Sequence, residues 1–118
     1  LWDGSEAQKL LFKLIDSNAN IFSSLGILEE YQKILKRDFD FSDDEIISIT
    51  EKVMGFIIII EPEERVDVIT EDPEDNKILE CAISSGSKYI VTYDNHLLKL
   101  KEFNGISIVK PEEIMRLI

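Results

Sequence analysis

The strongest structural signal in the chain lies between residues 72 and 94, which read DPEDNKILECAISSGSKYIVTYD. Asp72 and Pro73 form a typical helix start, with a capping side chain, a proline at the first helical position and acids in the first turn. Apolar residues then recur at helical spacing as far as Ser85, and a short apolar run follows. The stretch therefore predicts a helix over residues 74–85 and a buried strand over residues 88–92.

The segments on either side of this stretch also alternate between helix and strand patterns. The other expected helices lie from Ser5 to about residue 18, at residues 26–37, from Ser42 toward residue 56, and at residues 111–118, with a short helical turn at residues 97–100. The other expected strands lie at residues 21–23, 57–60 and 106–109, and a polar connection with a short apolar segment at residues 66–69 covers residues 61–72. Ser42 and Glu45 have the spacing of a capping box. Strands that alternate with helices predict a parallel sheet with helices on both faces.

Composition places the chain among ordinary globular proteins. It has 118 residues, of which 44% are hydrophobic and 31% charged, so we expect one domain over residues 1–118. The longest apolar run, Phe56–Ile60, is far shorter than the roughly 20 residues of a membrane span, and we expect no membrane partner. A single cysteine, Cys81, on an apolar helix face predicts a core residue and suits a cytoplasmic protein.

Acidic residues outnumber basic ones strongly. The chain has 24 Asp and Glu against 13 Lys and Arg, which gives a net charge of −11. Such a field repels phosphate backbones and argues against a protein that coats nucleic acid. Most of these acids are expected on a solvated surface, but a few held close together would bind divalent cations.

Two acids are expected to point inward from helices. Asp75 lies three and four residues before Ile78 and Leu79, which places its side chain on the apolar face of its helix, whereas Glu80 is expected to point away from the sheet. In the helix at residues 26–37, Glu30 borders the apolar stripe and Glu29 falls on the polar side.

A third acid, Asp94, directly follows the expected strand at residues 88–92. Helices that follow parallel strands begin at the carboxyl edge of the sheet, where open α/β sheets hold their ligands. We therefore expect Glu30, Asp75 and Asp94 to converge at this edge and to bind Mg²⁺ or Mn²⁺, which prefer oxygen ligands. The chemistry expected of such a site is metal-assisted hydrolysis of a phosphodiester.

Each acid also has a purely structural interpretation. Asp75 can serve the helix start, Asp94 a turn, and Glu30 a border position from which its charge reaches water. Asp72 is interpreted as a helix cap, and His96, the only histidine, as a surface residue. The coincidence of three acids at one edge is what favours a site.

The stretch at residues 72–94, together with Leu97 and Leu98, resembles the carboxyl-terminal half of PIN domains, in the branch described as toxin components of toxin–antitoxin systems. The segments at residues 27–35 and 110–113 extend the resemblance over nearly the whole chain. It implies a three-layer α/β/α fold with a central parallel sheet and a Mg²⁺- or Mn²⁺-dependent ribonuclease acting on single-stranded RNA. It assigns the catalytic and metal-binding acids to Glu30, Asp75 and Asp94, and a supporting hydroxyl to Thr92.

The resemblance also implies a first, central strand that ends in an Asp-x-Asn motif and is expected upstream of Leu1. An antitoxin protein and a second copy of the chain are the expected partners besides RNA. The alternative function is a catalytically silent PIN-like module that acts through protein contacts, and a phosphoacceptor receiver domain is a more distant one. Lys77, Lys88, Lys99 and Lys101 are the residues expected to contribute to a local basic patch for RNA.

Overall fold

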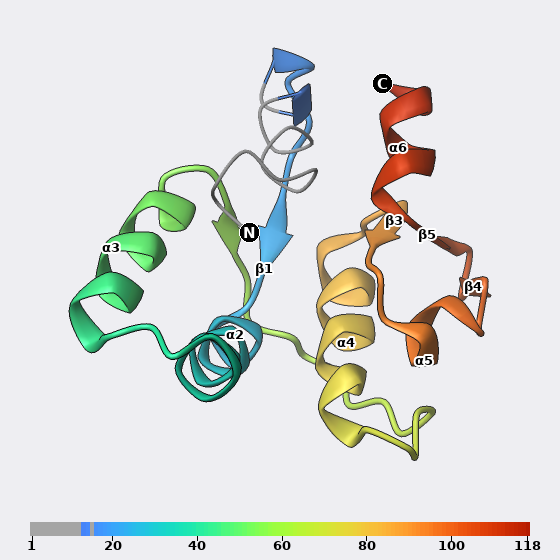
Figure 1. Cartoon of the computed structure of the whole chain (residues 1–118). Helices are drawn as coiled ribbons and strands as arrows, with labels where there is room; N and C mark the ends of the chain where they lie inside the picture. The colour runs from blue at the N-terminus through green and yellow to red at the C-terminus, as the bar shows by residue number, and fades with distance from the viewer. Residues whose placement is uncertain (1–12, 15) are drawn as a thin grey trace.

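The computed structural model describes residues 13–14 and 16–118, and helices alternate with strands along them (Figure 1). The helices are α2 (Leu25–Phe39), α3 (Asp43–Met54), the 3₁₀ turn η1 (Pro73–Asp75), α4 (Asn76–Ser85), α5 (Asn95–Leu98) and α6 (Pro111–Leu117). The strands are β1 (Phe22–Ser23), β2 (Ile58–Ile59), β3 (Tyr89–Val91), β4 (Glu102–Phe103) and β5 (Ile106–Val109). No membrane-spanning helix is found in this part of the chain. The order expected from residue 21 onward is confirmed, and the helix expected from Ser5 falls largely outside the described residues.

The strands form two small sheets. β1 pairs with β2 in parallel, and β3 pairs in parallel with β5, which also carries the antiparallel strand β4. The parallel pairing and the helices that accompany it fit the predicted α/β class. The predicted single central sheet does not form among the described strands, because β1 and β3 make no ladder with each other. The additional strand expected upstream of Leu1 lies outside the described residues.

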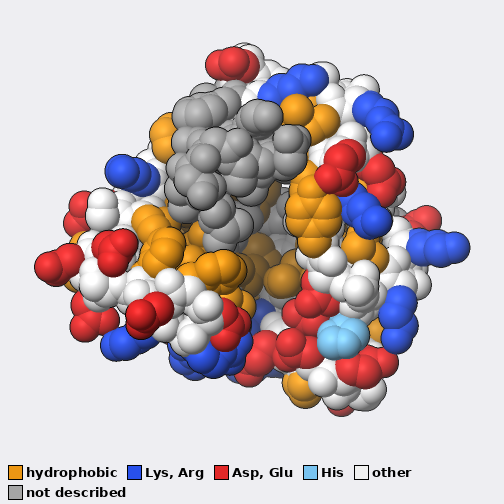
Figure 2. Space-filling model, in the orientation of Figure 1, with side chains coloured by type: hydrophobic (Ala, Val, Ile, Leu, Met, Phe, Trp, Pro, Cys, Tyr) orange, Lys and Arg blue, Asp and Glu red, His pale blue; other side chains and the backbone are white. Residues whose placement is uncertain are grey.

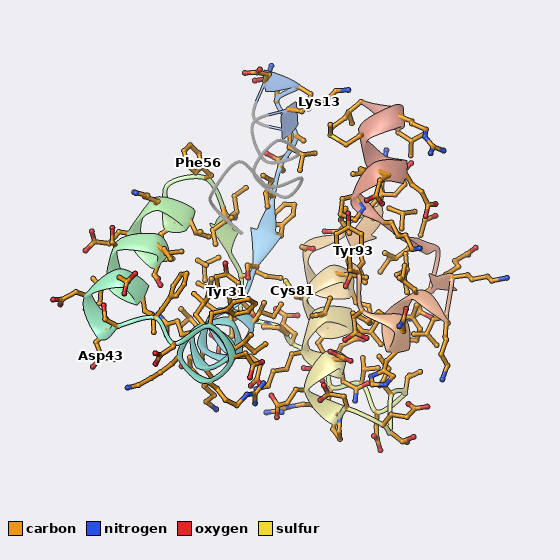
Figure 3. All side chains as sticks on the ribbon, in the orientation of Figure 1. Lys13, Tyr31, Asp43, Phe56, Cys81 and Tyr93 are labelled. Atoms are coloured by element: carbon orange, nitrogen blue, oxygen red, sulfur yellow. The ribbon has the colours of Figure 1, made fainter. Side chains whose placement is uncertain are left out.

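A groove of about 650 Å³ lies between β1 and β3, and helices α4 and α6 line its other sides. Its lining is mainly apolar and includes Phe22, Ile78 and Ile90, and hydrophobic side chains are visible in the hollow in Figure 2. Cys81 projects from the side of α4 that faces β1 and α2 (Figure 3). Burial leaves Cys81 4% exposed and raises the pKa of its thiol, which fits the predicted core role.

Strand β4 is a feature that the sequence patterns above do not predict. It pairs with β5 through a two-residue turn at Asn104 and Gly105, whose φ angles are 50° and 81°. Such turns need positive φ at both positions, and an Asn-Gly pair satisfies this at low cost. The pair was therefore a usable hairpin signal.

The main core lies between α4, α5 and the sheet of β3 and β5. Its buried members are Ile69, Leu79, Ala82, Ile90, Leu97, Ile106 and Ile108. Leu79 and Leu97 are completely buried, so the first turns of α4 and α5 are anchored by apolar contacts. On the other side of the groove, the predicted capping box of α3 is present, with reciprocal 3.1 Å hydrogen bonds between Ser42 and Glu45.

The connection at residues 61–72 is tied to α4 by the side chain of Asn76. The Asn76 carboxamide oxygen accepts hydrogen bonds from the backbone N–H groups of Val68 (3.1 Å) and Ile69 (2.9 Å). Its amide nitrogen donates to the carbonyl oxygens of Ile69 (2.9 Å) and Pro73 (3.0 Å). Backbone groups of the predicted apolar segment at residues 66–69 thus form hydrogen bonds with a side chain, whereas those of a strand would bond to a neighbouring strand.

Two further α4 side chains extend this anchoring. Glu80 accepts a hydrogen bond from the backbone N–H of Val66 (2.9 Å), and Ser84 accepts one from that of Glu63 (3.2 Å). Asn76, Glu80 and Ser84 are spaced by four residues and therefore share one helix face. Glu80 does project away from the groove-lining face, but the connection covers it, leaving it 9% exposed. We call these three side chains the α4 polar row.

Replacing Asn76 with alanine should destabilise the protein more than an ordinary polar truncation. It removes four hydrogen bonds and leaves buried backbone groups without partners, each costing about 1–3 kcal/mol. We expect urea unfolding to show a loss of about 2–4 kcal/mol. Asn20→Ala, at an exposed position, is the control and should change the unfolding free energy by less than about 0.5 kcal/mol. Equal effects of the two variants would show that the connection does not depend on Asn76.

Candidate metal centre

Acidic side chains gather around the histidine on the face shown in Figure 2. Asp72 caps η1, Asp75 is the last residue of η1, Asp94 follows β3, and His96 lies in α5. Asp75 is 9% exposed, and Leu79, four residues later, is completely buried on the same side of the helix. The expectation that Asp75 points inward is thus confirmed, and its position follows from the apolar face on which it lies.

Asp94 has a well-defined structural role. One of its carboxylate oxygens, Oδ1, accepts hydrogen bonds from the backbone N–H groups of His96 (2.7 Å) and Leu97 (3.3 Å), so Asp94 caps α5. The Thr92 hydroxyl oxygen accepts a hydrogen bond from the Asp94 N–H (2.9 Å). Because Asp94 caps the helix, α5 begins at Asn95, two residues before the turn expected at residues 97–100. Together these contacts fix the orientation of the Asp94 carboxylate.

His96 faces both of these carboxylates. Its Nδ1 lies 3.5 Å from Asp75 Oδ2 and 3.7 Å from Asp94 Oδ1, distances longer than those of normal hydrogen bonds. Nδ1 of His96 and Oδ2 of Asp75 are both buried and have no hydrogen-bond partner. His96 is therefore partly at the surface, as predicted, with a side chain that is 38% exposed, but its Nδ1 is buried and faces the cluster. Buried polar atoms without a hydrogen-bond partner are rare, and a bound water or ion between these two would satisfy both.

The electrostatics of the cluster raise the pKa of Asp75 to about 6. Burial of the carboxyl group is the main cause, repulsion from Asp94 and Asp72 adds to it, and His96 opposes it. At neutral pH the ionised Asp75 carboxylate therefore lowers the stability of the folded state. A bound divalent cation would offset this cost.

Asp72 lies at the exposed side of the cluster. Its Oδ1 accepts a hydrogen bond from the Glu74 N–H (3.3 Å), so the predicted cap is present. Ligand atoms of Asp72, Asp75 and His96 also lie within 4.8 Å of one another. Two carboxylates and an imidazole form a donor set that fits a divalent cation. The position of His96 two residues after Asp94, beside a strand end, is the sequence feature that could have placed it in this cluster.

Glu30 lies on α2, half-buried, while its neighbour Glu29 is exposed, as expected. Neither Glu30 nor Asp94 is part of the group formed by Asp72, Asp75 and His96. The charge of Glu30 acts on Lys77, whose pKa is raised first by a hydrogen bond to Glu74 and more weakly by Glu30. The structure therefore brings Asp75 and Asp94 together around His96 and leaves Glu30 near the Lys77–Glu74 ion pair.

Comparison with known protein families gives a match over most of the chain. A family model described as PIN domain matches residues 2–96 of the chain. Searches of curated proteins and of solved structures found no match. The matched region contains all of the acids discussed above together with Thr92 and His96.

Asp75→Asn should stabilise the metal-free protein at neutral pH. Because the folded state holds the Asp75 proton more tightly than the unfolded state, stability falls as pH rises from about 4 to about 6, and the loss persists above that range. In EDTA we expect urea unfolding of Asp75→Asn to show a gain of about 1–3 kcal/mol at pH 7.5 and little change at pH 4.

Asp67→Asn is the matched control, since Asp67 is an exposed acid in the connection. It should show no such pH-dependent gain. A lower stability of Asp75→Asn at pH 7.5, or an equal gain at both pH values, would contradict the electrostatic account of Asp75.

Proposed function

The chain belongs to the PIN domain family, a nuclease superfamily, and we propose that it is a divalent-metal-dependent endoribonuclease that cleaves single-stranded RNA. The observation that carries this proposal is the buried Asp75 carboxylate, whose unpaired Oδ2 lies in a cluster with Asp94 just beyond the carboxyl end of β3. Without a bound cation, the charge of Asp75 is buried beside Asp94 and Asp72, an arrangement that costs stability.

Within this proposal, Asp75, Asp94 and Glu30 hold Mg²⁺ or Mn²⁺. Such an ion, when bound, supplies electrostatic stabilisation of the negative charge that develops on a phosphodiester during hydrolysis. The chain contributes rigid placement of the ligands. Thr92 and the backbone N–H groups of α5 orient Asp94, and the junction of η1 and α4 orients Asp75. Glu30 lies outside the cluster around His96, so its place among the ligands rests on the resemblance to PIN domains.

RNA must approach this centre against a net charge of −11. Lys77 lies two residues after Asp75, and Lys99 follows α5 directly, so both lie close to the centre in sequence. Lys77 pairs with Glu74 and Lys99 with Glu71, and all four side chains are at least 39% exposed. Exposed ion pairs are weak, so phosphate groups of RNA can replace the glutamates as partners of these lysines. We infer that RNA binding is local and sensitive to salt.

We place the protein in the cytoplasm as the toxin of a toxin–antitoxin pair, with residues 1–118 forming one PIN-like domain. The antitoxin protein, or a second copy of the chain, is the expected protein partner. The resemblance to the toxin branch of the family supports this setting.

Cleavage of a fluorescently labelled single-stranded RNA by the intact protein tests the activity. We expect cleavage with Mg²⁺ or Mn²⁺ and none with excess EDTA. Asp94→Asn and Asp75→Asn should each lower the rate at least about 100-fold, because each removes a charge that holds the ion. Asp67→Asn should retain the wild-type rate.

Cleavage that persists in EDTA, or that Asp94→Asn leaves unchanged, would contradict the proposal. Metal binding that is absent from the wild type, together with no cleavage, would favour the alternative of a catalytically silent interaction module. A duplex RNA of the same sequence distinguishes single-strand preference from general nuclease activity.

A further inference from the structure

We propose that His96 is a ligand of the metal centre through Nδ1, and that Asp72, Asp75 and His96 form a mixed oxygen and nitrogen site favouring first-row transition cations such as Mn²⁺ and Co²⁺ over Mg²⁺. This inference rests on the proposed metal-dependent function. It adds a nitrogen donor to a centre otherwise assigned to carboxylates alone.

The position of the imidazole is fixed by its neighbours in the chain. The His96 backbone N–H donates to the Asp94 carboxylate at 2.7 Å, and the next residue, Leu97, is completely buried in the core. The ring therefore projects from a turn anchored at two adjacent residues. Such pre-positioning is what a metal ligand requires.

The unpaired atoms point to an ion between them. His96 Nδ1 and Asp75 Oδ2 are both buried atoms without a hydrogen-bond partner, and the Asp75 side chain is 12% exposed. Two atoms that each lie about 2.1 Å from one cation are about 3–4 Å apart, according to the angle between the bonds. The 3.5 Å distance between these two atoms falls within that range. Asp72 adds a third donor at the exposed side.

A simple ion pair explains the geometry less well. A protonated imidazole would donate a hydrogen bond to one carboxylate at roughly 2.7–3.2 Å. Nδ1 instead lies 3.5 Å from Asp75 Oδ2 and 3.7 Å from Asp94 Oδ1, both longer than a normal charge-assisted hydrogen bond. A shared cation satisfies the nitrogen and the Asp75 oxygen together.

The nitrogen donor determines which cation is favoured. Mg²⁺ binds oxygen ligands in near-octahedral geometry and keeps several waters, so an imidazole adds little to its affinity. Imidazole nitrogen binds first-row transition cations well, and Co²⁺ more strongly than Mn²⁺. His96 should therefore raise the affinity for Mn²⁺ and Co²⁺ and leave the affinity for Mg²⁺ almost unchanged.

Calorimetric titration of the intact metal-free protein with Mn²⁺, Co²⁺ and Mg²⁺ tests the preference, and pulsed EPR of bound Mn²⁺ tests the ligand directly. We expect nitrogen hyperfine coupling to Mn²⁺ in the wild type. His96→Asn should remove that coupling and weaken Mn²⁺ and Co²⁺ binding about tenfold or more, with Mg²⁺ affinity changed by less than about threefold. Asn95→Ala, an exposed position on the same short helix, is the matched control and should leave coupling and affinities unchanged.

The outcomes separate this inference from the proposed function. Mn²⁺ bound by the wild type without nitrogen coupling would overturn the role of His96 and leave a carboxylate centre in place. Failure of the wild type to bind any of the three cations would overturn both proposals. Equal weakening of all three cations in His96→Asn would overturn the preference, since His96 would then act only on the shape of the centre. The wild-type EPR result decides the ligand even if His96→Asn folds poorly.

Discussion

The hydrogen bonds of one buried side chain, Asn76, hold together the parts of the molecule on which the candidate site depends. Asn76 binds the backbone of the connection at Val68 and Ile69 and the carbonyl oxygen of Pro73 in η1. The connection, the 3₁₀ turn and α4 are thereby fixed relative to one another, so that Asp72 and Asp75 have defined positions. Buried networks of this kind specify one arrangement because a partly satisfied network is costly.

The burial of Asp75 in the candidate metal centre lowers the stability of the fold. Asp75 is buried close to other acids, and its pKa is raised to about 6. Keeping this carboxylate ionised at neutral pH therefore lowers the stability of the folded protein. The core beneath it, with Leu79 and Leu97 fully buried, supplies the apolar contacts that offset this cost. Local conflict of this type, supported by a well-packed surrounding, is typical of functional sites. The family match is consistent with such a site in this chain.

Sequence patterns predicted local features better than contacts between distant segments. The inward position of Asp75 and the location of Asp94 after a strand follow from periodicity within a few residues, and both could be read directly. The burial of Glu80 could not, since its partner is the N–H of Val66, 14 residues away in a connection without periodic structure. The separation of the strands into two sheets likewise depends on long-range pairing. The Asn104-Gly105 turn and the Asp94-x-His96 spacing were readable signals of a hairpin and of the imidazole.

The α4 polar row holds backbone N–H groups of residues 63–69 in hydrogen bonds, as a neighbouring strand would in a sheet. Amide hydrogens of Val66, Val68 and Ile69 are engaged by side chains of α4, so they should exchange slowly with deuterated solvent although they belong to no helix or sheet. Opening of this segment then requires loss of the contacts at the start of α4. Opening of the chain near Asp72 and Asp75 would therefore be one cooperative event shared with the helix, rather than independent loop motion.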